Sequence, residues 1–351
     1  MFKVGIFMSH AVIITLYYEN RKTIELCSRL HELGAENIVI VNDGCPRNNE
    51  FFNELISIGC HIVNLNGHNG KGASIRAGIK FAHDNLYNIT GYITADADGQ
   101  HTADDVMKIS RALELRPDCL ILGKRNLRKS KAPFAVRFGH FISSLYFKVI
   151  TGVKCKDTQT GLRGIPSSLY EIAMETKGDR FDYEMNFLTI CADRKIPFYD
   201  VNTTAQYSKE QKSSYRIFKD SYLIYKTPLK FATASVSCTI VDLILFTIFA
   251  YFLPSSTQWN VALATVLARI VSGGINFLIN RKMIFKNGGN DRNQVIRFII
   301  LFFCIMCAST VIVSLLSFIP IPVTIIKAIV DLLLWTVNYT IQRQWVFKEN
   351  K

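Results

Sequence analysis

Two patterns of hydrophobic and polar positions divide the chain. Up to about residue 227, short apolar runs alternate with stretches in which apolar residues recur at helical spacing. The first kind of run predicts buried β-strands and the second predicts amphipathic helices. The predicted strands cover residues 11–16, 38–42, 61–65, 91–95 and 119–122, and two helices cover residues 23–33 and 73–83. This alternation predicts an α/β, Rossmann-like domain with a mostly parallel sheet.

Beyond residue 228 the pattern becomes one of long apolar runs with charges mostly at their borders. Each run approaches the ~20 residues that an α-helix needs to cross a bilayer. The runs cover residues 231–253, 261–278, 298–318 and 323–341. We therefore predict a soluble domain at 1–227 and an all-α domain with four transmembrane helices at 228–351.

Charges between the apolar runs predict how the chain is oriented in the membrane. The connections at 254–260 and 320–322 carry no charge, whereas residues 281–297 and the C-terminus are basic. By the positive-inside rule, both termini, the middle loop and the soluble domain lie in the cytoplasm. The first 16 residues are apolar but run directly into the strand pattern. We interpret them as leading into a cytosolic strand and not as a signal peptide.

The net charge of the 351-residue chain is +13, divided into +6 for residues 1–227 and +7 for residues 228–351. This excess favours anionic partners such as phosphates and acidic lipids. Nucleic acid is the competing partner, but the charge lies beside membrane segments and no known nucleic-acid motif is present. We expect no nucleic-acid binding.

A basic segment follows the fifth predicted strand, and within residues 124–163 its only acidic residue is Asp157. Apolar residues at 134, 138, 141, 142, 145 and 149 follow helical spacing. A basic amphipathic helix at about 131–152 is typical of a helix lying in the membrane interface. The alternative is a core helix with a solvated basic edge. We predict a second interfacial helix at about 214–226.

Polar residues follow the predicted strands, at the sheet edge where α/β proteins bind ligands. Asp43 follows the second strand in an Asn-Asp-Gly sequence, which fits either a contact to a nucleobase or ribose or an ordinary turn. Lys71 follows the third strand in a glycine-rich segment and could meet phosphate, although Gly72 after it excludes a P-loop. Asp96 and Asp98 follow the fourth strand, and such a pair can hold Mg²⁺ or Mn²⁺. A turn with two solvated acids is the alternative.

Six segments, in this order, resemble the family 2 glycosyltransferases of the GT-A fold. The similarity is to polyprenyl-phosphate mannose and glucose synthases, including those that carry a C-terminal GtrA-like membrane domain. It covers nearly the whole chain. The matching segments are residues 41–44, 69–72, 96–100 with its Asp-x-Asp pattern, 123–125, 157–164 and 180–185.

The resemblance implies inverting, metal-dependent transfer of a hexose from a UDP- or GDP-sugar to polyprenyl phosphate on the cytoplasmic face of the membrane. A homo-oligomer is compatible with it. Asp98 and Arg125 would be catalytic. The implied donor-binding residues are Tyr17, Glu19, Asn42, Asp43, Lys71, Asp96, Ala97, Asp98 and Gln100. Mg²⁺ or Mn²⁺ would be held by Asp98, Gln100 and Asp96, and the acceptor phosphate by Arg125, Arg137, Arg163 and Lys212.

One departure from the family pattern concerns the first loop. The family reads Pro-x-Tyr-Asn-Glu, whereas this chain has Thr15 and Tyr18 in place of the Pro and Asn and keeps Glu19 in register. This leaves altered donor use open. The alternative functions are a transporter or flippase of lipid-linked sugar with a degenerate glycosyltransferase domain, and a polysaccharide synthase. The intact Asp96, Asp98 and Arg125 argue against the first, and the absence of Trp from residues 1–227 argues against the second.

An internal repeat is visible in the second half. Asn276 is followed by Arg281 and by a Phe-Lys pair at 285–286, and the same pattern begins again at Asn338, 62 residues later. The repeat predicts two helical hairpins of the same orientation. Chance similarity of two basic helix ends is the alternative.

Overall fold

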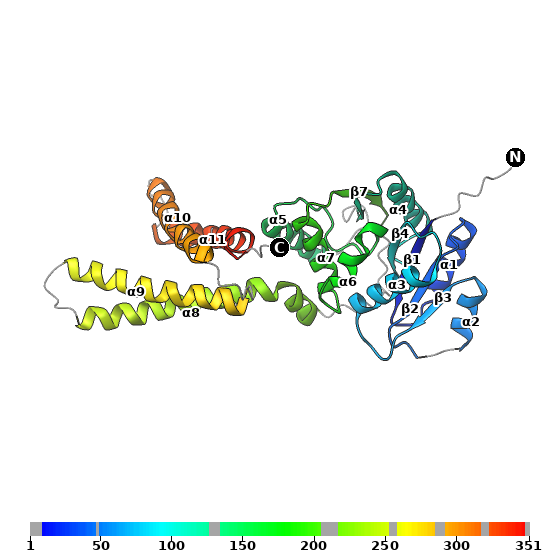
Figure 1. Cartoon of the computed structure of the whole chain (residues 1–351), viewed down its shortest axis with the longest axis horizontal. Helices are drawn as coiled ribbons and strands as arrows, with labels where there is room; N and C mark the ends of the chain where they lie inside the picture. The colour runs from blue at the N-terminus through cyan, green and yellow to red at the C-terminus, as the bar shows by residue number, and fades with distance from the viewer. Residues whose placement is uncertain are drawn as a thin grey trace. The chain divides into compact units, whose positions relative to one another are not determined.

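The chain forms two compact units, Met1–Ile224 and Tyr225–Lys351 (Figure 1). The computed structural model describes residues 9–46, 49–125, 134–204, 217–252, 258–284, 292–316 and 323–347.

The first unit contains a seven-stranded sheet with the order β3-β2-β1-β4-β6-β5-β7. Every pairing is parallel except those of β6, which runs antiparallel to β4 and to β5. The strands are β1 (His10–Leu16), β2 (Ile38–Asn42), β3 (His61–Asn64), β4 (Gly91–Asp96), β5 (Leu120–Arg125), β6 (Arg163–Pro166) and β7 (Phe198–Thr203). This mostly parallel sheet confirms the predicted fold class.

Helices of this unit connect the strands and cover the two faces of the sheet (Figure 1). They are α1 (Arg21–Glu32), α2 (Asn49–Ser57), α3 (Lys71–Asn85), α4 (Ala103–Leu115), α5 (Phe134–Thr151), the 3₁₀ turn η1 (Ser167–Leu169), α6 (Tyr170–Glu175) and α7 (Asp182–Asp193). The five predicted strands correspond to β1–β5. Strands β6 and β7 were not predicted, because one is a four-residue segment with Gly and Pro and the other mixes polar with apolar residues.

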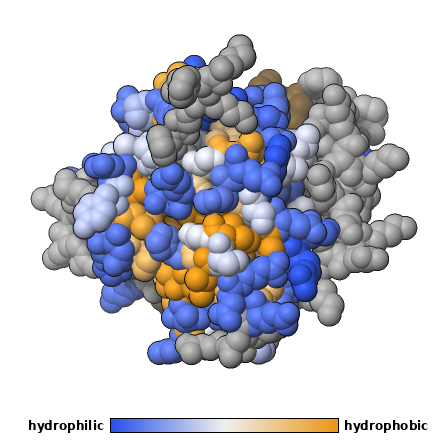
Figure 2. Space-filling view, turned by 90° about the vertical axis from the view of Figure 1, so that its right-hand side faces the viewer, coloured by the Kyte–Doolittle hydropathy of each residue, from blue (hydrophilic) through white to orange (hydrophobic). Residues whose placement is uncertain are grey.

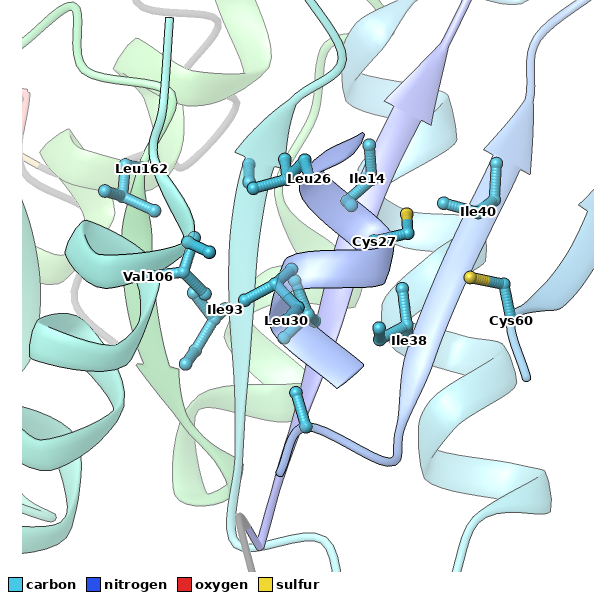
Figure 3. Close-up of a cluster of buried hydrophobic side chains, with 14 of the residues drawn as sticks. Ile14, Leu26, Cys27, Leu30, Ile38, Ile40, Cys60, Ile93, Val106 and Leu162 are labelled. Atoms are coloured by element: carbon cyan, nitrogen blue, oxygen red, sulfur yellow. The ribbon is translucent and has the colours of Figure 1, made fainter. Parts of the chain in front are cut away.

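The alternation of side chains along β1 creates two cores, one on each face of the sheet. Val12, Ile14 and Leu16 belong to the core under α1, α2 and α4. Ala11 and Ile13 belong to the opposite core, to which α3, α6 and α7 contribute. Figure 3 shows part of the first core, where side chains of α1 and α4 meet those of β1, β2 and β4. Both faces of β1 are buried, as expected of a central parallel strand.

His10 is a buried group whose titration should make folding pH-dependent. It is 1% exposed, its Nδ1 lies 2.9 Å from Ser110 Oγ, and burial lowers its pKa from 6.5 to about 4. Below about pH 6.5 the unfolded His10 binds a proton that the folded one excludes down to about pH 4, so stability should fall across that interval, by at most about 3 kcal/mol. Urea midpoints from pulse proteolysis at about pH 7 and about pH 5 measure this loss. A His10→Gln variant should lose less; an equal loss would contradict the assignment.

The second unit is helical, and each predicted apolar run falls mainly within one of its helices. These are α8 (Ile217–Phe252), α9 (Gln258–Ile279), α10 (Arg292–Leu316) and α11 (Val323–Ile341). Among the described residues, Leu229–Phe249 is long and apolar enough to cross a membrane, and Asn293–Ala308 is a shorter apolar helix. Aromatic side chains link α8 to α11 in this unit, since the Phe231 ring lies 5.1 Å from that of Tyr339.

The internal repeat appears in the structure as two π-helical turns. Turn η2 (Asn280–Ile284) follows α9, and η3 (Gln342–Val346) follows α11. The first residues of the two turns are buried, and Asn280 Nδ2 donates to Gln342 Oε1 at 2.9 Å. Each also bonds one turn back, Asn280 to Asn276 at 2.6 Å and Gln342 to Asn338 at 3.1 Å. Equivalent positions of the repeat therefore form one amide network, with the buried Asn280 and Gln342 at its centre.

Candidate functional site

The C-terminal ends of the parallel strands gather the predicted polar residues at one edge of the sheet. In the register of the sheet, Thr15 of β1 lies opposite Asp96 of β4, and Leu16 lies opposite Asn42 of β2. The residues that follow these strands therefore start from the same edge. Arg125 ends β5. Figure 2 shows one face of the molecule, on which hydrophilic side chains surround a smaller apolar area.

Asp96 is the centre of a cluster of charged side chains. Its Oδ1 lies 2.7 Å from Lys71 Nζ, at the first residue of α3, and its Oδ2 lies 3.3 Å from His101 Nε2. Lys71 Nζ also lies 3.2 Å from Glu184 Oε1, on α7. Although burial alone would raise the pKa of Asp96, Lys71 and His101 hold it well below its usual range. Burial likewise opposes the charge of Lys71, but Asp96 and Glu184 raise the pKa of its ammonium group.

Asp98 lies in the turn after β4 and has surroundings that differ from those of Asp96. Its Oδ1 accepts from the backbone N–H of Gln100 at 2.9 Å and its Oδ2 from Gln100 Nε2 at 2.7 Å. Burial and the nearby charge of Asp96 raise the pKa of the Asp98 carboxyl. Both effects disfavour the ionised form of the Asp98 carboxyl, and a bound cation would favour it.

The turn that carries Asp98 is tied to the start of α1. Asn20 Nδ2 and Thr23 Oγ1 both donate to the carbonyl of Ala97, at 3.2 and 3.0 Å. Gly99 in this turn has φ +79°, and a Cβ there would lie 2.4 Å from Lys22 Cδ. The backbone conformation therefore favours glycine here, whereas the exposed and flexible Lys22 side chain could move to make room for a Cβ.

Asp43 is buried and organises the glycine-rich segment after β3. Its carboxylate accepts from the backbone N–H groups of Asn69 at 2.6 Å and Gly70 at 2.9 Å, and lies 3.0 Å from His68 Nδ1. The His68 ring packs on Tyr17, with 4.0 Å between ring centroids. His68 thus contacts both Asp43 and Tyr17, which are two of the predicted donor-binding residues.

The remaining predicted donor-binding residues lie close by in the fold. Asn42 is buried, accepts from the Cys45 N–H at 2.9 Å and donates to Asn64 Oδ1 at 3.0 Å, so it shapes the turn that carries Asp43. Glu19 is exposed on the loop after β1.

Arg125 is held by a buried carboxylate. Its Nε and Nη2 donate to the two oxygens of Asp157 at 2.8 and 2.9 Å, and its backbone N–H lies 3.2 Å from Asp157 Oδ2. Burial alone would raise the pKa of Asp157, but Arg125 and His140 hold it well below its usual range. Arg137 is exposed on α5. Lys212 lies outside the described residues.

Arg163 is placed differently from the other predicted phosphate ligands. It is 2% exposed and donates to three backbone carbonyls, those of Thr160 at 2.9 Å, Glu184 at 2.9 Å and Thr158 at 3.3 Å. This position makes Arg163 the support of the turn at 158–160, instead of a group presented to a ligand.

Sequence reasoning gave no role to four residues that complete these contacts, namely His68, His101, Asp157 and Glu184. One signal was available, because Asp157 is the only acid in a long basic segment and so has to neutralise part of it. Glu184 and His101 lie beside or within matched segments, but their contacts to Lys71 and Asp96 depend on the packing of α3, α4 and α7.

Comparison with known proteins divides the chain as the fold does. Residues 230–347 match the family model of the GtrA/DPMS transmembrane domain. The chain is 25% identical over 217 residues to the UDP-N-acetylglucosamine–dolichyl-phosphate N-acetylglucosaminyltransferase of Methanococcus voltae, covering 56% of this chain and 86% of that protein. It is 27% identical over 208 residues to the uncharacterized protein MJ1222 of Methanocaldococcus jannaschii, covering 58% of this chain and 83% of that one.

Solved structures similar to this chain include glucosyl-3-phosphoglycerate synthase from Mycobacterium tuberculosis. Its complex with Mn²⁺, UDP-glucose and phosphoglyceric acid has a TM-score of 0.47 and 12% identity, and covers 63% of this chain and 77% of that one. The family model, the sequence relatives and the mostly parallel sheet agree with the resemblance of the six segments. Residues 230–347 match the GtrA/DPMS transmembrane domain, and the chain is a glycosyltransferase of the nucleotide-sugar type that carries this membrane domain.

Proposed function

We propose that the chain transfers a hexose from a nucleotide-sugar to polyprenyl phosphate on the cytoplasmic face of a membrane. The observation that carries this proposal is the polar edge of the sheet, where Asp96 ends β4 beside Lys71, Asp98 lies in the turn that follows, and Arg125 ends β5. Carboxylates and cations at one sheet edge suit a negatively charged diphosphate and its metal ion. The transmembrane domain supports a lipid acceptor.

The residues at Asp98 fit a divalent cation of the Mg²⁺ or Mn²⁺ kind. Among the described residues, no group of three or more His, Cys, Asp or Glu side chains forms a protein cage for a metal. Such a cation is usually held by one or two carboxylates and by phosphate oxygens. Asp98, with Asp96 and the amide of Gln100, would supply the protein ligands. When bound, the cation would neutralise charge on the leaving diphosphate.

The acceptor needs little activation by the protein. A phosphate monoester has its second pKa at about 6, so at neutral pH it is largely an oxyanion already. The protein then has to bring the two phosphate-bearing substrates together in the reactive orientation and offset the repulsion between their negative charges. Arg125 and Arg137 supply positive charge for this purpose. We therefore expect direct displacement with inversion at the anomeric carbon.

Helix α5 supports the position of the catalytic domain at a lipid surface. Its apolar residues Phe138, Phe141, Ile142 and Leu145 lie at helical spacing and are 38–60% exposed, whereas Phe147 on the opposite face is buried. Arg137 and Lys148 of the same helix are exposed. An apolar stripe flanked by basic side chains is typical of a helix in the membrane interface. We propose the bilayer as its partner, because the same chain carries a transmembrane domain.

The experiment that tests this function follows a labelled sugar into lipid. The purified full-length chain, in vesicles that contain polyprenyl phosphate, receives UDP-N-acetylglucosamine, UDP-glucose or GDP-mannose with Mg²⁺ or Mn²⁺. The Methanococcus voltae relative, named for a UDP-sugar and dolichyl phosphate, makes the first donor the leading choice. We expect one donor to give a lipid product that mild acid releases and that a chelator prevents. No labelled lipid from any donor, with folded protein, would favour a transporter.

A further inference from the structure

Asp157 lies between the catalytic edge of the sheet and helix α5. Its side chain has no solvent exposure, yet it is a carboxylate. A buried carboxylate is costly unless cations and N–H groups surround it. The Arg125 guanidinium is such a cation, and it donates two parallel hydrogen bonds to Asp157, at 2.8 and 2.9 Å. The backbone N–H of Gln159 lies 3.2 Å from Asp157 Oδ1. The paired bonds fix the plane of the Arg125 guanidinium.

The same carboxylate is also in contact with α5. Asp157 Oδ1, which accepts from Arg125 Nη2, lies 3.2 Å from His140 Nε2. One turn further along α5, Ser143 Oγ lies 2.8 Å from Thr158 Oγ1, and both of these side chains are buried. Thr158, through a hydrogen bond, and Asp157, through a close contact with His140 Nε2 that lacks hydrogen-bond geometry, thus connect α5 to the segment that orients Arg125.

This segment reaches the metal-binding aspartates as well. Four residues beyond Asp157, Gly161 passes close to the Asp96 carboxylate, and its carbonyl accepts from Thr94 Oγ1 at 2.8 Å. Residues 157–161 therefore connect three features, namely α5, Arg125 and Asp96. A movement of α5 would therefore be transmitted through residues 157–161 to Arg125 and Asp96.

We propose that Asp157 is a positioning residue that, with His140, makes the orientation of Arg125 depend on how α5 is seated. When the apolar stripe of α5 lies on the bilayer, His140 lies against one oxygen of Asp157, and Asp157 holds Arg125 toward the phosphate of the lipid acceptor. The inference rests on the proposed function, because it concerns the same acceptor. Neither Asp157 nor His140 is proposed to contact the substrate. Their role in acceptor binding is to position Arg125.

Steady-state kinetics with both substrates varied would test the proposal. Asp157→Asn keeps the shape but loses the charge that orients Arg125, so KM for polyprenyl phosphate should rise about tenfold or more. KM for the nucleotide-sugar should stay near the wild-type value. His140→Ala should raise the acceptor KM in the same way, and His140→Gln, which keeps an N–H group beside Asp157, should restore most of the wild-type affinity. Gly139→Ala on the same helix is the control, since its added Cβ meets no atom within 4 Å.

The link to the bilayer has a test of its own. Phe141→Glu, which places a charge in the exposed stripe, should also raise the acceptor KM. If both changes act through the same contact, the Phe141→Glu, His140→Ala double variant should be no worse than the more affected single variant. If the acceptor KM of the double variant instead rises by the product of the two single-variant factors, the stripe acts independently of Asp157. That result would overturn the coupling.

The outcomes separate this inference from the proposed function. A wild-type chain that labels no lipid would overturn the proposed function and this inference with it. Wild-type transfer with an unchanged acceptor KM in His140→Ala and in Asp157→Asn would overturn the inference alone. Equal rises in both KM values would assign Asp157 a merely structural role. If Asp157→Asn fails to fold, the pair of His140 variants still decides the question.

Discussion

Asp98→Ala is expected to lower transfer of sugar into lipid about a thousandfold, with the protein still folded. The Asp98 carboxyl is partly buried and lies near the negative charge of Asp96, and both raise its pKa. A divalent cation stabilises the ionised form of such a carboxyl. Loss of this metal ligand should weaken charge neutralisation on the leaving diphosphate and raise the activation free energy by about 4 kcal/mol. Labelled lipid formed per minute at saturating donor measures the loss.

An exposed acid a few residues away provides the matched control. Asp104 lies in the first turn of α4 with its side chain in solvent, and Asp104→Ala should transfer sugar at nearly the wild-type rate. Raising Mn²⁺ should not rescue Asp98→Ala, whereas binding of the free nucleotide diphosphate without metal should persist. An Asp98→Ala enzyme that keeps more than about a tenth of wild-type transfer would rule out a metal held by this carboxylate.

Gly161→Ala is expected to reduce transfer about a hundredfold by displacing Asp96, because misplacement by about 1 Å can cost that much. A Cβ at position 161 would lie 2.1 Å from Asp96 Oδ2 and 2.7 Å from its Cγ. The Asp96 carboxylate is held on its other sides by Lys71 and His101, so it cannot move without breaking an ion pair. Overpacking of this kind also costs about 1–3 kcal/mol of folding stability.

The measurement compares the Gly161→Ala and Gly139→Ala variants, which differ in the space around the new methyl group. A Cβ at Gly139 meets no atom within 4 Å, so this change in α5 should leave transfer intact and slightly stabilise the helix. Urea midpoints separate lost activity from lost folding. Full transfer by Gly161→Ala would show that Asp96 does not need its present position.

Much of the fold could be predicted because the apolar patterns are local. Strand β1 is apolar on both faces. Tyr17, Asp43 and Asp98 follow the ends of β1, β2 and β4, so their gathering at one edge follows from parallel pairing alone. Strands β6 and β7 lack such a local apolar pattern. Their place in the sheet depends on pairing with β4 and β5, which lie far away in the sequence.

The partners within the site could not be predicted, because they depend on distant segments. Lys71 was expected to contact phosphate, yet it lies between the carboxylates of Asp96 and Glu184, the second of which comes from α7. Arg163 was grouped with Arg125 as a phosphate ligand, but burial turns its guanidinium toward three carbonyls. Spacing along the sequence identifies charged residues but does not show which of them neutralise one another.

The amide network of the membrane unit has a consequence for the history of that domain. Asn280 and Gln342 are 62 residues apart, which is also the offset of the sequence repeat, and they bond to each other. Contact between equivalent positions is the property of an isologous, two-fold interface. A single hairpin that paired with a second copy of itself would have formed the same contact between equivalent amides. Duplication and fusion of its gene accounts for the present arrangement. A domain cut between the hairpins should accordingly reassemble from its two halves.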